Sequence, residues 1–104
     1  MRMQLAVTGV LLLLAAGARA QNDTKDLYLN KCAACHGPDG AAKTMMGRKL
    51  KLADIRTLVD KHSEAEMIGV VQNGKGTAMN AYGKDFTKDQ IKGLVEYLRG
   101  LAKQ

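Results

Sequence analysis

Two cysteines separated by two alanines, with a histidine directly after them, are the residues best suited to chemistry: Cys32-Ala33-Ala34-Cys35-His36. Residues three apart share one face of a helical turn, so both thiols can meet one edge of a flat ligand. A C-x-x-C-H run is typical of covalent haem c attachment, in which the thiols add to the two vinyl groups. The histidine can then offer its imidazole to the haem iron. The spacing therefore predicts a haem c site held by Cys32, Cys35 and His36.

Three other sites could use this cysteine pair. A redox-active disulfide of the thioredoxin type usually accompanies a βαβ pattern, and this sequence has none. A structural zinc ion needs four ligands, and beyond the motif only His62 is left to help provide them. A plain structural disulfide is the third alternative. The adjacent histidine favours haem attachment over all three.

The N-terminus has the three parts of a secretory signal peptide. Arg2 precedes a short apolar run, Leu5–Ala16, and the small-x-small sequence Ala18-Arg19-Ala20 follows it. The apolar run is too short to span a bilayer comfortably. We therefore expect residues 1–20 to be removed on export to the periplasm, leaving residues 21–104 as one domain. Free thiols tend not to persist there, which again favours covalent use of both cysteines.

Length and composition limit the fold. A chain of 104 residues with 46% apolar and 25% charged residues indicates one small soluble domain. It has no room for a doubly wound nucleotide-binding sheet or a barrel enzyme. So small a domain buries a modest core, and a bound haem would enlarge it. Removal of the basic residues Arg2 and Arg19 lowers the formal charge from +6 to +4.

The first half of the predicted domain contains one clear helix. It should run from Asp23 to Cys32, with Asp23 or Thr24 as its N-cap. Glycine and proline after the motif histidine end regular structure. The basic stretch Gly40–Lys51 is expected to be a connection. One or two irregular helical turns should follow, marked by the spacing of Leu52, Ile55, Leu58 and Val59.

The second half predicts two capped helices. Capping boxes at Ser63–Glu66 and Thr87–Gln90 mark their starts, and Asn73-Gly74 ends the first helix. The first helix has an apolar side formed by Met67, Ile68, Val70 and Val71. The second has one buried stripe formed by Ile91, Leu94, Val95, Leu98 and Leu101. No alternating strand pattern occurs, so the predicted domain is all-α.

Two stretches together resemble a known family. The run Leu27–Gly40 resembles the haem-binding start of a small bacterial class I c-type cytochrome. The run Gly76–Gly83, followed by a capped helix with Gly93 and Tyr97, resembles that family's methionine loop and last helix. The resemblance implies a class I cytochrome c fold, with three to five short helices around one covalently bound haem.

The resemblance also implies two axial ligands, His36 below the iron and a methionine above it. Met79 is the expected ligand, because its glycine-rich loop gives the backbone freedom to reach the metal. Met67 is expected to fill core space on its helix. Met45 and Met46 follow the histidine too closely to fold back over the ring easily. Some carbonyl should accept the Nδ1 proton of His36, although the sequence leaves open which one.

In the resembled family the first and last helices cross at an aromatic contact. Tyr28 and Tyr97 fall on those positions, with Gly93 allowing close approach. This sequence departs from the family at three places. Thr24 stands where a glycine is common, and Asn80 follows Met79 where many relatives carry proline, which implies a less rigid ligand loop. The only proline, Pro38, is two residues after His36, whereas many relatives carry a proline later, whose carbonyl orients the axial imidazole.

The predicted function is single-electron transfer between redox proteins, without an enzymatic step. The alternatives are a haem protein with an open distal site, gas-binding or peroxidatic, and a fixed subunit of a larger oxidoreductase. Spread basic residues favour partners with acidic docking patches, and Arg48 and Arg56 are candidates to pair with haem propionates. His62 is expected at the surface. The sequence favours neither nucleic-acid binding nor stable membrane insertion after signal cleavage.

Overall fold

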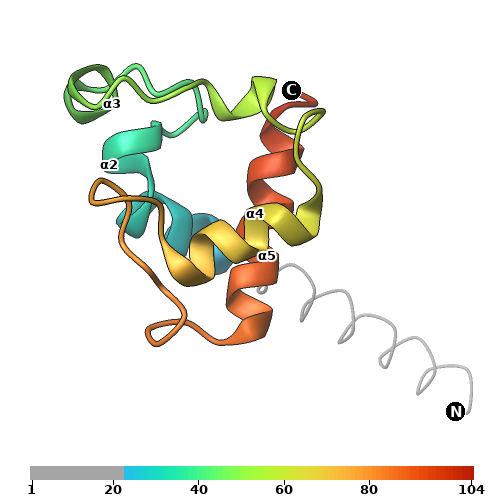
Figure 1. Ribbon diagram of the computed structural model, residues 1–104. Helices are drawn as coiled ribbons and strands as arrows, with labels where there is room; N and C mark the ends of the chain where they lie inside the picture. Colours follow the sequence, from blue (N-terminus) through green and yellow to red (C-terminus); the bar gives the residue numbers. More distant parts are fainter. Residues whose placement is uncertain (1–22) are drawn as a thin grey trace, which may run out of the picture.

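The computed structural model describes residues 23–104 and is helical, as predicted (Figure 1). The predicted signal peptide, residues 1–20, lies outside the described residues. An N-terminal helix covers residues 23–31. It is followed by α2 (Ala33–His36), α3 (Met45–Lys49), the 3₁₀ helix η1 (Ile55–Thr57), α4 (Glu64–Asn73) and α5 (Lys88–Leu101). Within residues 23–104, no helix is long and apolar enough to cross a membrane.

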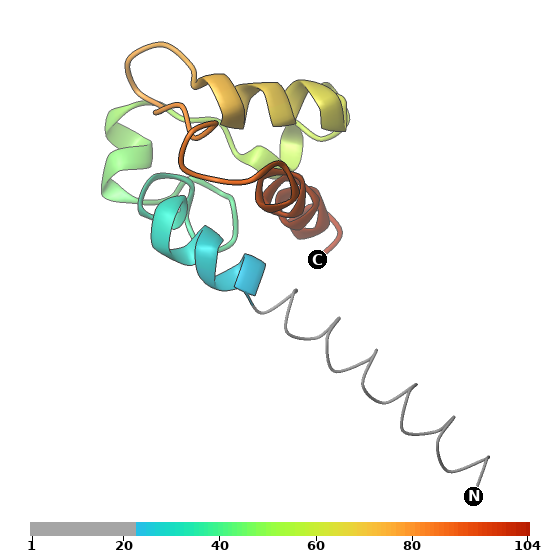
Figure 2. The same cartoon turned by 90° about the horizontal axis from the view of Figure 1, so that it is seen from below.

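Helix α5 forms the centre of the core. Its capping box is present as predicted: the Gln90 amide donates to the Thr87 hydroxyl, and the Thr87 amide donates to the Gln90 side chain. The predicted stripe is buried along its whole length, with 6% or less of each side chain exposed: Ile91, Leu94, Val95, Leu98 and Leu101. Figure 2 shows the other elements arranged around this helix, which is seen nearly along its axis.

Helix α4 packs against α5 and begins and ends as predicted. Ser63 and Glu66 form the capping box, and Gly74 ends the helix with a φ of 76°. The predicted apolar side is only partly right. Val71 is buried, whereas Val70 is exposed. A helix lying on one side of a small core buries only a narrow stripe, and Val70 lies beyond it.

The N-terminal helix lies against α5 at the predicted aromatic contact. The rings of Tyr28 and Tyr97 are 5.0 Å apart, and Tyr28 is fully buried. Thr24 lies opposite Gly93, where an added Cβ would come within 3.2 Å of the threonine hydroxyl. The missing side chain of Gly93 thus makes room for the larger residue at position 24. The cap predicted at Asp23 or Thr24 is wrong, because both of these residues are themselves helical.

The Tyr28 hydroxyl ties the N-terminal helix to the end of the cysteine–histidine motif. It donates a hydrogen bond of 2.6 Å to the carbonyl of Gly37, the residue after His36. Burial raises the pKa of Tyr28, so the hydroxyl remains protonated and able to donate. We expect Tyr28→Phe to lower the free energy of unfolding by about 1 kcal/mol, because it removes a buried hydrogen bond and leaves the Gly37 carbonyl only the 3.2 Å bond from the Gly40 amide. Denaturant titration checks this, and an unchanged midpoint would contradict it.

The connection predicted over Gly40–Lys51 contains a helix. Thr44 caps α3, since its hydroxyl accepts a hydrogen bond of 2.8 Å from the Gly47 amide. Thr44 is a local signal for the start of a helix. It was passed over because the glycine at position 47 lowers the helix propensity of the residues that follow. The irregular turn predicted further on is present as η1, where Ile55 is buried against α5.

Candidate haem site

The two cysteines lie one helical turn apart. Cys32 precedes α2, and its carbonyl accepts hydrogen bonds from the amides of Cys35 at 3.3 Å and His36 at 3.0 Å. Both cysteines are free thiols and both are half-buried. The sequence folds into a turn here because two alanines favour helix, while Gly37 ends it with a φ of 81°.

The Cys32 side chain belongs to the edge of the core. It packs against the cluster that contains Tyr28, Ile55 and Leu94. Burial, followed by the nearby Cys35 thiol, raises the pKa of Cys32 to about 11. The thiol is therefore protonated at neutral pH, unlike the thiolate of a reactive redox pair.

His36 has the properties required of an iron ligand. It is half-buried, and its Nδ1 atom is buried without a hydrogen-bond partner among the described residues. The predicted carbonyl acceptor is thus not found in this part of the chain. Burial lowers the pKa of His36, which favours the neutral imidazole with a free lone pair. A neutral imidazole beside two free thiols fits the donor set of haem c.

Helix α3 is fastened to the backbone of this turn. The Thr44 hydroxyl donates a hydrogen bond of 2.8 Å to the carbonyl of Cys35, and the Ala42 amide donates one of 2.8 Å to the carbonyl of His36. Gly47 is buried against the same turn. A Cβ at Gly47 would lie 2.7 Å from the Cys35 carbonyl oxygen and would also meet the carbonyl of Ala42. The close approach of α3 to the motif therefore requires a glycine.

We expect Gly47→Ala to lower the free energy of unfolding by about 2–3 kcal/mol, because the new methyl group must displace backbone carbonyls. The matched control is Gly100→Ala, an exposed helical glycine with nothing within 4 Å of the added Cβ. The free energy of unfolding of this control should rise by about 0.5–1 kcal/mol, because alanine has a higher helix propensity than glycine. Thermal unfolding compares the two variants, and equal midpoints would argue against tight packing at Gly47.

The four methionines in residues 23–104 lie in different environments. Met45 is 86% and Met46 is 41% exposed on α3. Met67 packs into the core, and its sulfur lies 3.5 Å from the Arg99 guanidinium. Met79 is half-buried in the loop after α4, where its amide and carbonyl pair with those of Lys75. The structure thus brings Cys32, Cys35 and His36 together on one turn and places Met79 on a separate loop.

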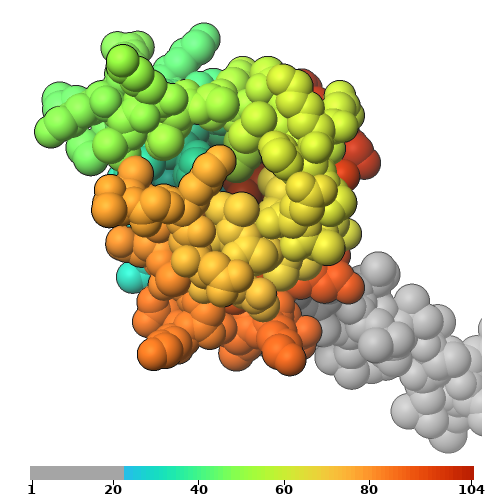
Figure 3. Space-filling view, in the orientation of Figure 1, coloured from blue at the N-terminus to red at the C-terminus, as the bar shows by residue number. Residues whose placement is uncertain are grey.

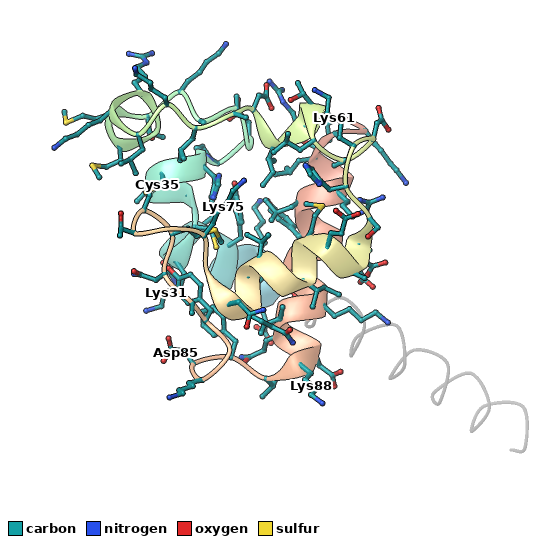
Figure 4. All side chains as sticks on the ribbon, viewed as in Figure 1. Lys31, Cys35, Lys61, Lys75, Asp85 and Lys88 are labelled. Carbon is teal, nitrogen blue, oxygen red and sulfur yellow. The ribbon has the colours of Figure 1, made fainter. Side chains whose placement is uncertain are left out.

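A hollow opens between the stretch around α3, the helix α4 and the loop after α4 (Figure 3). Teal atoms of the motif region and red atoms of α5 are visible inside it. In Figure 4, Cys35 on α2 and Lys75 on the loop border this hollow. It is therefore the face of the molecule on which the motif and the methionine loop meet.

Two aromatic residues pack beside Met79, and no role was predicted for them. The rings of Tyr82 and Phe86 are stacked, 5.1 Å apart, and pack against the same cluster as Met79. Burial, followed by the charges of Cys32 and Cys35, raises the pKa of Tyr82. Tyr82 and Phe86 are four residues apart in a loop, where no periodic pattern predicts that the two rings meet.

The remaining predicted residues lie outside the motif. Arg56 is paired with Asp54, with nitrogen and oxygen 2.7 Å apart, so its first partner is a carboxylate of this chain. Arg48 is exposed on α3. His62 is exposed beside Glu66, with a nitrogen-to-oxygen distance of 3.2 Å, which confirms the surface position expected for it.

Comparisons with known proteins agree with this arrangement. The family model described as cytochrome c oxidase, cbb3-type, subunit III matches residues 19–98. A solved structure titled KustC0563 c-type cytochrome superimposes with a TM-score of 0.69 at 29% sequence identity, covering 74% of this chain and 94% of that one. No curated protein gave a significant match. The chain belongs to the matched cytochrome family, and it is a small c-type cytochrome.

Proposed function

We propose that this chain carries single electrons between redox proteins in the periplasm. In this proposal residues 1–20 direct export, and residues 21–104 form the working domain. Cys32 and Cys35 hold one haem c through thioether bonds, while His36 and Met79 ligate its iron. Haem supplies a reversible ferrous–ferric couple.

The protein side chains set the properties of that couple. Two thioether bonds would fix the ring to α2, so that electron transfer involves no movement of the cofactor. The methionine sulfur favours the ferrous state and raises the reduction potential. If His36 and Met79 both bind the iron, no position would remain at which a substrate could bind it. A carrier needs these properties, and an oxidase or peroxidase needs an open position.

The observation that carries the proposal is the turn that holds the motif. Cys32, Cys35 and His36 lie on one helical turn, both thiols are free and half-buried, and burial favours the neutral form of the imidazole. Two thiols that can add to vinyl groups, beside a neutral imidazole that can bind iron through its Nε2 atom, are the donor set that haem c attachment needs.

Voltammetry of the purified coloured protein tests the proposal. We expect one reversible one-electron wave at a positive potential, with the same current in the presence and absence of oxygen or peroxide. Carbon monoxide should bind the reduced protein poorly. A catalytic current with peroxide, or ready binding of carbon monoxide, would instead support the open-site alternative.

A second candidate function is a fixed electron-entry subunit of a larger oxidase. The family description, which names subunit III of a cbb3-type oxidase, favours it. Size-exclusion chromatography of a native extract separates the two candidates. A free carrier elutes near the mass of a small monomer, whereas a subunit elutes with the large complex.

A further inference from the structure

Residues 40–53, named here the α3 segment, concentrate positive charge. The segment contains four basic residues and no acidic one. All four are exposed, and none forms an ion pair with a residue in the described part of the chain: Lys43, Arg48, Lys49 and Lys51. The acidic residues on either side are already engaged. Asp39 accepts a hydrogen bond from the Ala41 amide, and Asp54 is paired with Arg56.

Two methionines are exposed among these cations. Within residues 23–104 the large exposed hydrophobic side chains are Leu29, Met45, Met46 and Val70. Met45 is by far the most exposed of them, at 86%, and Met46 is 41% exposed. Methionine is flexible and polarizable, so it adapts to a partner surface better than branched side chains do. The segment thus combines exposed apolar and exposed positive side chains, with both methionines lying between Lys43 and Arg48 in the sequence.

The α3 segment is held directly on the haem motif. Thr44 hydrogen-bonds the Cys35 carbonyl, Ala42 hydrogen-bonds the His36 carbonyl, and Gly47 packs against the same turn. Figure 4 shows side chains of this segment projecting from one corner of the molecule, next to α2. A protein bound to this corner would therefore lie beside the turn that holds the haem.

We propose that the α3 segment is the docking surface for an acidic redox protein, an inference that rests on the proposed function. The positive charge of this surface favours an acidic partner, because four cations without ion-pair partners among residues 23–104 would attract clustered carboxylates. The exposed methionines would supply the apolar contact of the interface. A protein partner fits better than a bilayer, since α3 has only 5 residues and the segment carries no aromatic anchor.

The test compares two variants that lose equal charge. One is Lys43→Gln/Arg48→Gln/Lys49→Gln in the α3 segment. The other is Lys84→Gln/Lys88→Gln/Lys92→Gln, three exposed lysines before and on α5; Figure 4 shows Lys88 at the end of the molecule away from α3. A third variant, Met45→Ser/Met46→Ser, removes the two exposed methionines. Stopped-flow mixing with photoreduced flavodoxin, an acidic flavoprotein used as the probe, measures the rate of electron transfer at low ionic strength.

We expect the α3 charge variant to lower the second-order rate about tenfold, and the α5 charge variant to lower it less than about twofold. The methionine variant should slow transfer without changing its dependence on salt. Equal losses in the two charge variants would overturn the inference. So would an unchanged rate for the α3 charge variant combined with lost binding to anionic phospholipid vesicles.

The haem spectrum and reduction by dithionite are recorded for every variant. If the spectrum and the reduction stay normal while the electron-transfer rates of the two charge variants are equal, the assignment of the docking surface is wrong and the proposed function stands. If the wild-type protein shows no reversible reduction, the proposed function itself fails.

Discussion

Replacing both motif cysteines by serine is expected to abolish covalent haem. In Cys32→Ser/Cys35→Ser neither side chain can add to a vinyl group, so haem staining on a denaturing gel should fall to background. The variant should also accumulate poorly, because Cys32 packs against the main core cluster and a small domain gains much of its core from the bound ring. Gel staining and the yield of soluble protein from a host that matures c-type cytochromes measure both effects.

Ala34→Ser is the matched control, because it places a hydroxyl in the same motif at an exposed position and keeps both thiols. It should stain like the wild-type protein. Full staining of the double cysteine variant would contradict the assignment of Cys32 and Cys35 as attachment sites.

Replacing Met79 by alanine is expected to have the second largest effect. Loss of the sulfur ligand removes its preference for ferrous iron, so the reduction potential should fall by a few tenths of a volt, a fraction of the roughly 0.8 V that axial ligands span. The vacated position should also let the reduced protein bind carbon monoxide readily. Redox titration and a carbon monoxide difference spectrum measure the two changes.

Met46→Ala is the control for this ligand, since Met46 is 41% exposed on α3 and packs in neither core cluster. Its potential and carbon monoxide binding should match the wild-type values. A large change in the reduction potential and carbon monoxide binding of Met46→Ala, with none in Met79→Ala, would indicate that Met46 is the sulfur ligand.

The elements that the sequence predicted well are those fixed by local signals. Both capping boxes form because hydroxyl, amide and carboxyl groups three residues apart meet whenever a helix begins there. The buried stripe of α5 was fully predicted, because its helical spacing places every member on one face. The contact between Tyr28 and Tyr97 followed from the family resemblance, since nothing local connects residues so far apart.

The features that were missed or wrong depend on tertiary contacts. Helix α3 is held by Gly47 against the Cys35 and Ala42 carbonyls, and a sequence shows that glycine only as a weak helix former. Val70 looks apolar and periodic, yet it lies outside the narrow contact between α4 and α5.

The site was predictable to different degrees along the chain. The motif placed Cys32, Cys35 and His36 together because residues three and four apart are neighbours on one face of a helical turn. The role of Met79 and the stacked ring pair beside it depends on how a long glycine-containing loop folds. No periodicity fixes that path, so the contacts of Tyr82 and Phe86 emerged only from the structure.

The most direct test of the central claim is mass spectrometry of the tryptic peptide Cys32–Lys43, which lies between cleavage sites after Lys31 and Lys43. We predict that this peptide carries the added mass of one haem, joined to both Cys32 and Cys35, and that acid-acetone leaves the colour with the protein. An unmodified peptide, together with colour that acid-acetone extracts completely, would contradict the account.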